Sequence, residues 1–87
     1  MVRLRWHKRF AKKMETLGPI ERTRAVKSLS QVRADVHHPS LNFEKLSTDY
    51  FTIRVNLNFR IALLHVEGDL YEVIDIDTHT AIYHRYG

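Results

Sequence analysis

Cysteine is absent from the 87 residues of this chain, so it can form neither a disulfide framework nor a thiolate metal site. Long apolar runs are also absent, and no stretch approaches the roughly 20 apolar residues that a membrane span requires. No apolar run follows the charged residues at the N-terminus, as a secretory leader would need. We therefore expect a cytoplasmic location and no contact with a membrane.

The sequence contains none of the common motifs for nucleotide binding, acyl transfer or zinc binding. The three glycines form no phosphate-binding loop, and no serine stands in the glycine-flanked elbow of acyl-transfer enzymes. The six histidines include no carboxylate–histidine helix motif of the kind that binds zinc. The sequence thus indicates no metal site and no small-molecule cofactor.

Hydrophobic residues make up 44% of the chain, enough for one modest core but not for two. We expect a single domain over residues 1–87. Positive charge is concentrated in residues 1–35, where ten Lys and Arg stand against three Asp and Glu, whereas residues 36–87 hold four against seven. Such a basic half is typical of a protein that binds nucleic acid or an acidic protein, although the solvated face of two ordinary helices would look the same.

Apolar spacing predicts a short strand followed by two helices. The N-terminal run Val-Arg-Leu-Arg-Trp alternates, as in a first strand or in the lead-in to a helix. Phe10, Met14 and Leu17 are spaced by four and three, which predicts an amphipathic helix that ends at Gly18. Pro19 suits the first turn of a second helix. The apolar stripe of that helix is predicted to contain Ile20, Thr23, Ala25, Val26, Leu29 and Val32.

The rest of the chain is predicted to form antiparallel strands. Residues 43–46 and 50–55 each have the pattern of a short strand. The Asn-Leu-Asn run at 56–58 then fits a three-residue hairpin loop, since asparagine tolerates the left-handed backbone that such a turn needs. The resulting register places Arg54 directly opposite Arg60.

A second turn, at Gly68-Asp69, sets the register of the last two strands. The expected pairs are Arg60 with Asp77, Ala62 with Asp75, Leu64 with Val73 and Val66 with Tyr71. The predicted core face consists of Phe59, Ile61, Leu63, Ile74 and Ile76. The opposite face is predicted to carry the charges Arg54, Arg60, Asp75 and Asp77 and exposed Ala62, Leu64 and Val73. The predicted fold class is α+β, with an N-terminal two-helix hairpin packed on an antiparallel sheet of three or four strands.

Arg54, Arg60, His79 and Tyr83 converge at one end of this predicted sheet. Two arginines that face each other are destabilising unless an anion lies between them, and their N–H forks match phosphate oxygens. Histidine exchanges protons near neutral pH, and tyrosine offers a hydroxyl and a ring on which a base stacks. Such a set can cleave a phosphodiester without a metal. The alternative is structural: Arg60 pairs with Asp77, and the C-terminal residues only pack.

The order of these motifs resembles the RelE/ParE superfamily of toxins from toxin–antitoxin systems. The resemblance is carried by Ile53-Arg-Val-Asn56, Phe59-Arg-Ile61, the Gly68-Asp69 turn and His79-x-x-x-Tyr83. Upstream, the same plan is followed by Trp6-His-Lys-Arg-Phe10, the two-helix hairpin, His38-Pro-Ser-Leu41 and Phe43-Glu-Lys-Leu46. The match covers nearly the whole chain and rests on order and spacing, since each motif alone is weak.

The resemblance implies a ribosome-dependent endoribonuclease that cuts messenger RNA without a metal and so inhibits translation. By motif, Arg60 corresponds to the phosphate-binding arginine, His79 to the acid and Tyr83 to the tyrosine at the cleavage site, while Arg54 lies at a position that is often basic. The implied partners are the ribosome, messenger RNA and a cognate antitoxin, which we expect to use the exposed apolar side chains of the charged face. The candidates for RNA contact are Arg9, Lys12, Lys13 and Lys45.

A ParE-like toxin that inhibits DNA gyrase by binding, without nuclease activity, has the same fold and is the alternative. The His-x-x-x-Tyr motif beside two sheet arginines favours the nuclease. Asp75 and Asp77 favour a protein without nuclease activity, because they make the sheet less basic than in the lysine-rich nucleases. A third hypothesis is an inactive relative that binds only its antitoxin.

Overall fold

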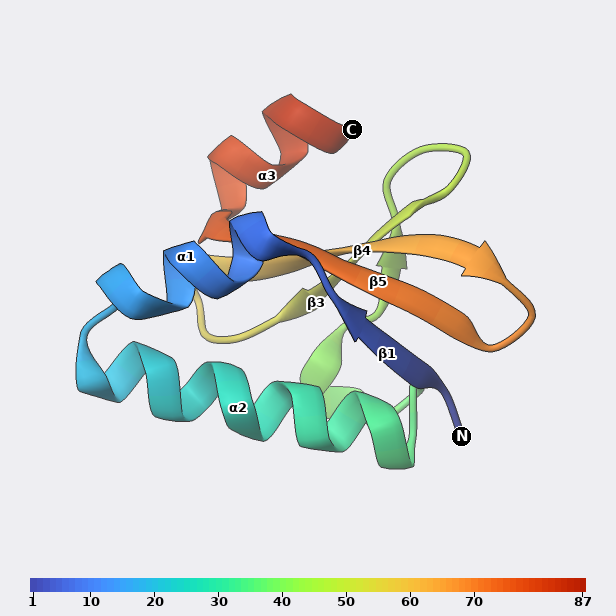
Figure 1. The fold of residues 1–87 in the computed structure, drawn as a ribbon, viewed down its shortest axis with the longest axis horizontal. Helices are drawn as coiled ribbons and strands as arrows, with labels where there is room; N and C mark the ends of the chain where they lie inside the picture. The colour runs from blue at the N-terminus through green and yellow to red at the C-terminus, as the bar shows by residue number, and fades with distance from the viewer.

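The computed structural model describes all of residues 1–87 as three helices around one sheet (Figure 1). In chain order the elements are β1 (Arg3–Trp6), α1 (Lys8–Thr16), α2 (Pro19–Ala34), the short 3-10 helix η1 (Pro39–Leu41), β2 (Glu44–Lys45), β3 (Tyr50–Arg54), β4 (Phe59–Glu67), β5 (Leu70–Thr78) and α3 (His79–Tyr86). None of the helices has the length and apolar character needed to cross a membrane.

The five strands form one mixed sheet in the order β1-β5-β4-β3-β2. β1 lies parallel to β5 at one edge, and all other neighbours are antiparallel. In Figure 1, α2 lies below the sheet and α3 above it. The α+β class is confirmed, but the sheet has more strands than predicted and is not wholly antiparallel. The pairing of β1 with β5 joins segments far apart in the sequence, and local alternation carries no signal for it.

The two-helix hairpin forms as predicted. At the start of α1, His7 Nδ1 accepts a hydrogen bond from the Arg9 amide (3.0 Å). Gly18 separates the helices, and Pro19 begins α2, where its missing N–H removes no helical hydrogen bond. Arg22 donates to carbonyl oxygens at the end of α1, which fixes the corner between the helices.

The buried face of α2 is narrower than the predicted stripe. Ala25, Leu29 and Val32 are buried in the main core, as predicted. Ile20 and Val26, which the spacing assigns to the same stripe, are 68% and 53% exposed. Helical spacing marks an apolar side of the helix but does not show how much of it the sheet covers.

The β3–β4 hairpin has the predicted register, with Arg54 opposite Arg60. Its loop is closed by Asn56, whose Oδ1 accepts hydrogen bonds from the amides of Asn58 (2.9 Å) and Phe59 (2.8 Å). Neither asparagine has a positive φ, so the expected left-handed backbone is wrong. A side-chain hydrogen bond of the Asx type shapes the loop instead.

The β4–β5 hairpin turns at Gly68, which has a φ of +50° that a side chain would strain. The predicted pairs Arg60–Asp77 and Ala62–Asp75 are confirmed. Closer to the turn the register shifts at two bulges. The observed pairs there are Leu63–Val73, Leu64–Glu72 and His65–Tyr71, in place of the predicted Leu64–Val73 and Val66–Tyr71. A bulge adds one residue to one strand, which alternation alone does not reveal.

Each face of the sheet has its own core. The main one, under α1 and α2, includes Ile53, Ile61, Leu63, Val73 and Ile76. The smaller one, under α3, consists of Ala62, Ile74 and Ile82 with Leu46, Tyr50, Leu64 and Tyr86 around it. The bulge therefore moves Ile74 out of the predicted core face and Val73 into it.

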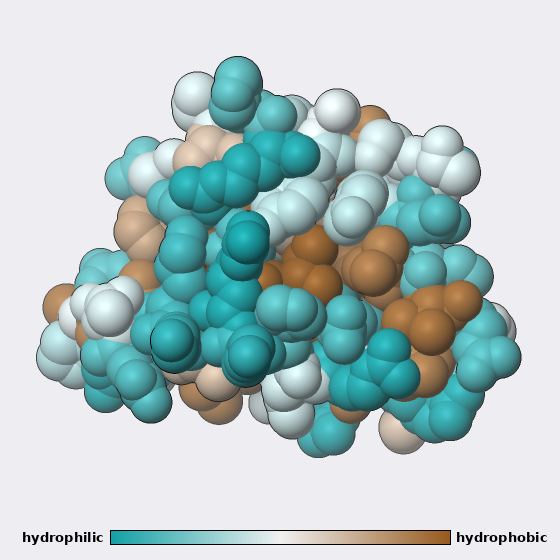
Figure 2. Space-filling model, turned by 45° about the horizontal axis from the view of Figure 1, so that its top comes forward, coloured by the Kyte–Doolittle hydropathy of each residue, from teal (hydrophilic) through white to brown (hydrophobic).

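The face opposite α2 is covered rather than open. Ala62 and Val73 are fully buried and Leu64 is partly buried, so the prediction that these side chains are exposed to a partner is wrong. For Ala62 and Leu64 the reason is α3, whose Ile82 is buried against this face. Val73 is buried because the bulge turns it into the main core on the other face. Figure 2, which turns the upper side of the molecule forward, shows a mostly hydrophilic surface with small apolar patches.

Candidate active site

The structure brings the four predicted site residues to one end of the sheet. Arg54 ends β3, Arg60 lies opposite it near the start of β4, and His79 and Tyr83 follow β5 on α3. The amide of His79 donates to Asn58 O (2.7 Å), which ties the start of α3 to the β3–β4 loop. No three His, Asp or Glu side chains lie together as a metal site would need.

Arg60 is buried, with 7% of its surface exposed, and holds the β3–β4 loop. One terminal nitrogen donates to Asn56 O (2.7 Å) and to Phe59 O (3.1 Å). The Nε atoms of Arg60 and Arg54 are both buried without a hydrogen-bond partner. Burial, and then the positive charge of Arg54, lower the pKa of Arg60. Buried N–H groups that lack a partner leave a site that an anion can satisfy.

Arg60 forms no ion pair with Asp77, although the two lie opposite each other across the strands. The Asp77 carboxylate instead contacts Lys13 Nζ (2.8 Å) and Arg85 Nη2 (2.9 Å). Burial alone would raise the pKa of Asp77, but hydrogen bonds from Lys13, the Thr78 amide and Arg85 outweigh it and lower the pKa to about 2. The alternative in which Arg60 only forms an ion pair with Asp77 is therefore wrong.

Glu44 on β2 is a member of this cluster that sequence reasoning missed. The Tyr83 hydroxyl donates to the Glu44 carboxylate. Burial and this hydrogen bond raise the pKa of Tyr83 to about 12, against an opposing effect of Arg60. Tyr83 is therefore a neutral hydroxyl at neutral pH, and the negative charge beside it also acts on Arg60. Glu44 stands within the Phe-Glu-Lys-Leu motif, but nothing in the sequence places that motif opposite α3.

His79 lines a cavity of about 610 Å³ together with Arg60, Asn58 and Thr80. Its exposed imidazole lies against the ring of Tyr83, with the ring centroids 4.1 Å apart and the planes 36° apart. The N-terminus of α3 contributes positive partial charge at the same place. The cavity can therefore hold a phosphate between a cation and a group that transfers protons.

The four predicted RNA-contact residues lie outside this cavity. Lys13 is held by two aspartates of β5, at 3.1 and 2.8 Å. Arg9 donates to a tyrosine hydroxyl of α3 (3.2 Å). Lys12 and Lys45 are exposed on α1 and β2. A role in RNA binding stays a prediction for all four, and the last two have the freer side chains.

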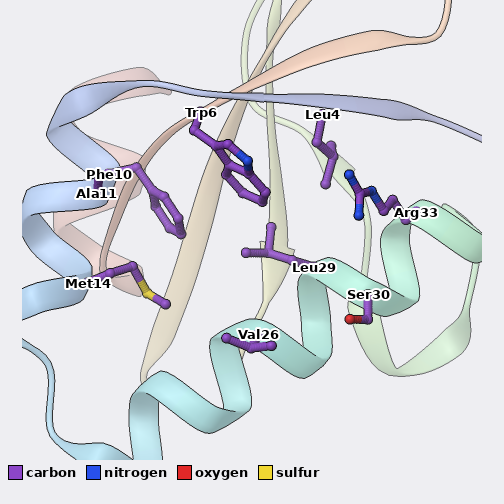
Figure 3. A pocket seen from close by; sticks show the side chains of 9 residues that line it. All are labelled: Leu4, Trp6, Phe10, Ala11, Met14, Val26, Leu29, Ser30 and Arg33. Atoms are coloured by element: carbon purple, nitrogen blue, oxygen red, sulfur yellow. The ribbon is translucent and has the colours of Figure 1, made fainter.

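A second concave site lies away from the arginines, between β1, α1 and α2 (Figure 3). Trp6 is 50% exposed and stacks on Phe10, with ring centroids 5.8 Å apart. Both rings point toward Val26 and Leu29 across a groove of about 450 Å³. Seven of its nine lining residues are hydrophobic, and Arg33 lies at one end. Apolar side chains exposed in a concave surface are typical of a protein-binding site.

Comparison with known proteins gives a structural relative but no sequence family. No protein-family model and no curated protein sequence matches the chain. Its structure is similar to that of a chain in the RelB–RelE antitoxin–toxin complex from Methanococcus jannaschii, with a TM-score of 0.71 and 21% sequence identity. The match covers 94% of this chain and 98% of that one. At this identity the similarity establishes the fold.

Proposed function

We propose that the chain is the toxin of a type II toxin–antitoxin system, and that it cleaves messenger RNA on the ribosome, in the cytoplasm, without a metal. One observation carries the proposal: two neighbouring arginines have buried N–H groups without partners, beside a histidine and a tyrosine–glutamate pair. The fold shared with a chain of an antitoxin–toxin complex supports the class of protein.

The reaction that suits these side chains is attack of a ribose 2′-oxygen on the adjacent phosphorus. Glu44 takes the proton of the 2′-hydroxyl, and Arg60 and Arg54 bind the non-bridging oxygens, whose negative charge grows in the phosphorane. His79, as an imidazolium, protonates the departing 5′-oxygen. The products are a 2′,3′-cyclic phosphate and a free 5′-hydroxyl. Tyr83 positions Glu44 and offers its ring for base stacking.

Toeprinting of a translated messenger RNA tests the nuclease. The purified protein should create new RNA ends, and Glu44→Gln and His79→Ala should each lower the cleavage rate by roughly 10²–10⁴-fold without weakening ribosome binding. Full activity in both variants would show that the cluster is not catalytic. Absence of cleavage by the wild type, together with inhibition of gyrase supercoiling, would favour the ParE-like alternative.

For the antitoxin we propose an acidic amphipathic segment that binds the groove between α1 and α2. The groove offers half-exposed Trp6 and Val26, and α1 and α2 together hold eight Lys and Arg against two Glu. An apolar stripe flanked by acidic side chains complements both features. We therefore propose this groove as the antitoxin site in place of the predicted sheet face, which α3 covers.

Trp6→Ala tests this partner site. When the protein is co-expressed with its cognate antitoxin, the substitution should weaken the complex more than about tenfold, because a tryptophan in a groove is a typical hot spot. Messenger RNA cleavage should not change. Ile20→Ala, which removes an exposed apolar side chain outside the groove, is the matched control. Equal affinity of the Trp6→Ala and wild-type proteins would place the antitoxin elsewhere.

A further inference from the structure

A polar cleft of about 580 Å³ lies between α2, η1 and the end of β3. The residues that give it its chemistry are Arg24, Lys27 and Gln31 of α2, His38 and Ser40 at η1, and Arg54 of β3. The α2 residues are spaced by three and four, so they share one face of the helix. The cleft is separate from the apolar groove and from the cavity beside His79.

Positive charge in this cleft has no carboxylate to offset it. Arg24, Lys27 and Arg54 take part in none of the ion pairs of the structure, and no Asp or Glu lines the cleft. Lys13 and Arg85, in contrast, are each held by two aspartates of β5. Cations grouped in a concave site raise the local concentration of anions.

Hydrogen bonds within the protein hold the walls of the cleft in place. Ser28 Oγ on the buried side of α2 donates to Arg54 O (3.0 Å), which fixes the end of β3 against the helix. Ser40 Oγ donates to Gln31 Oε1 (3.0 Å), which joins η1 to α2. Because the walls are fixed, a ligand would find the cations already arranged, and little ordering is needed on binding.

We infer that this cleft binds a backbone phosphate of single-stranded RNA that flanks the scissile one; the inference rests on the proposed function. Arg54 connects the two sites, since it lines the cleft and lies directly opposite Arg60 across the strands. An RNA strand whose scissile phosphate lies at Arg60 continues past Arg54 toward Lys27 and Arg24. The electrostatic contact with RNA then comes mainly from α2, because aspartates of β5 already hold part of the charge of α1.

Two double variants that remove the same charge test the cleft. Arg24→Gln with Lys27→Gln changes the cleft, whereas Lys8→Gln with Arg33→Gln changes exposed positions outside it on the same two helices. All four side chains are exposed, so both variants should keep the wild-type melting temperature. The probe is a fluorescent 2′-O-methyl oligoribonucleotide, which resists cleavage, and its affinity is measured by anisotropy at several salt concentrations.

The cleft variant should bind this probe about tenfold more weakly at low salt, with a salt slope smaller by about 0.7 for each lost phosphate contact. The control variant should stay within about twofold of the wild type. Equal losses in the two variants, or no loss in either, would overturn the assignment. A methylphosphonate oligomer of the same sequence, which lacks the backbone charge, should bind the wild type and the cleft variant equally well. A preference for the wild type with that probe would contradict phosphate recognition.

The cleavage assay separates this inference from the proposed function. If the cleft variant binds RNA normally while Arg60→Lys abolishes cleavage by the protein, the cleft assignment fails and the nuclease stands. If the cleft variant loses RNA binding but the wild type never cuts messenger RNA, the nuclease proposal fails and the RNA site stands.

Discussion

Arg60 holds its own hairpin loop and, in the proposed function, a phosphate of the substrate. Its hydrogen bonds to Asn56 O and Phe59 O use one terminal nitrogen, so the other N–H groups of the guanidinium fork are left for a ligand. The register of the strands could be predicted from the sequence and places Arg60 at the sheet end. The burial of Arg60 could not be predicted, because the atoms that cover it come from the loop and from α3.

We predict that Arg60→Ala loses both cleavage and stability. Hydrogen bonds from a charged group to carbonyl oxygens contribute about 1–3 kcal/mol to the free energy of unfolding. The loss of phosphorane stabilisation should lower the cleavage rate by roughly 10²–10³-fold. Arg60→Lys should fold better than the alanine variant but still cleave poorly, because the planar fork is lost. Urea unfolding and the ribosome assay measure the two effects, and wild-type cleavage by the alanine variant would remove Arg60 from the mechanism.

Tyr83→Phe separates the hydroxyl of this residue from its ring. Since the pKa of Tyr83 is raised to about 12, the hydroxyl does not ionise at neutral pH, and we expect less than about a tenfold loss of cleavage rate. Tyr83→Ala should lose more, because base stacking contributes about 1–3 kcal/mol. Single-turnover cleavage on the ribosome measures both. A loss in Tyr83→Phe as large as that in His79→Ala would mean that the hydroxyl itself transfers a proton.

Among the elements, α3 is attached to the sheet by a buried carboxylate as well as by the buried side chain of Ile82. Asp75 is fully buried, accepts hydrogen bonds from Tyr86 Oη (2.8 Å) and Arg85 Nη1 (2.9 Å), and lies 3.1 Å from Lys13 Nζ. Burial alone would raise the pKa of Asp75, but these hydrogen bonds outweigh it and lower the pKa. Asp75 thus joins α1, β5 and α3, and through α3 it positions His79.

We predict that Asp75→Asn destabilises the protein by about 3 kcal/mol, because Lys13 and Arg85 each lose a charge-assisted contact with a buried carboxylate and keep only Asp77. Tyr86→Phe is the matched comparison, since it removes one hydrogen bond to the same carboxylate and should cost about 1 kcal/mol. Urea unfolding at neutral pH measures both free energies. A loss in Asp75→Asn no larger than that in Tyr86→Phe would show that the ion pairs contribute nothing to the attachment of α3.

The elements that could be predicted from the sequence are those with local signals. The corner at Gly18-Pro19 and the turn at Gly68 are fixed by neighbouring residues, and both form where expected. The parallel pairing of β1, the bulges of β4 and β5 and the cover provided by α3 depend on distant contacts. The same division holds for the site: hairpin register and spacing place four of its residues, whereas Glu44 enters only through the pairing of β2 with β3.

Across the whole molecule, the acidic C-terminal half offsets part of the basic N-terminal half. Aspartates of β5 hold Lys13 of α1, while Arg24 and Lys27 of α2 are left without carboxylate partners. The uneven charge of the sequence therefore becomes, in the fold, a partly neutralised α1 and a basic cleft beside α2. Asp75 and Asp77, which make the sheet less basic, do not line the cleft and form no ion pair with Arg54 or Arg60.

The same ion network makes the stability of the protein depend on pH. The pKa of Asp77 falls from 3.8 to about 2 on folding, so its contribution is fully present above about pH 4 and is lost as the pH falls toward 2. The lowered pKa of Asp75 acts in the same direction. The contribution of Tyr83 to stability depends on pH in the opposite direction. Its pKa rises from 10.0 to about 12 on folding, so this contribution is present below pH 10 and is lost as the pH rises toward 12.

We predict that the free energy of unfolding falls between about pH 4 and pH 2, with at most about 2 kcal/mol due to Asp77, because its carboxylate is partly exposed. Asp77→Asn should be less stable than the wild type at pH 7 and should show a shallower decline below pH 4. Glu67→Gln, which neutralises an exposed carboxylate outside any ion pair, should keep the wild-type slope. Urea unfolding at pH 7, 4 and 2.5 measures these slopes. A decline in Asp77→Asn as steep as in the wild type would mean that acid acts on other carboxylates and not on the contacts of Asp77 with α1 and α3.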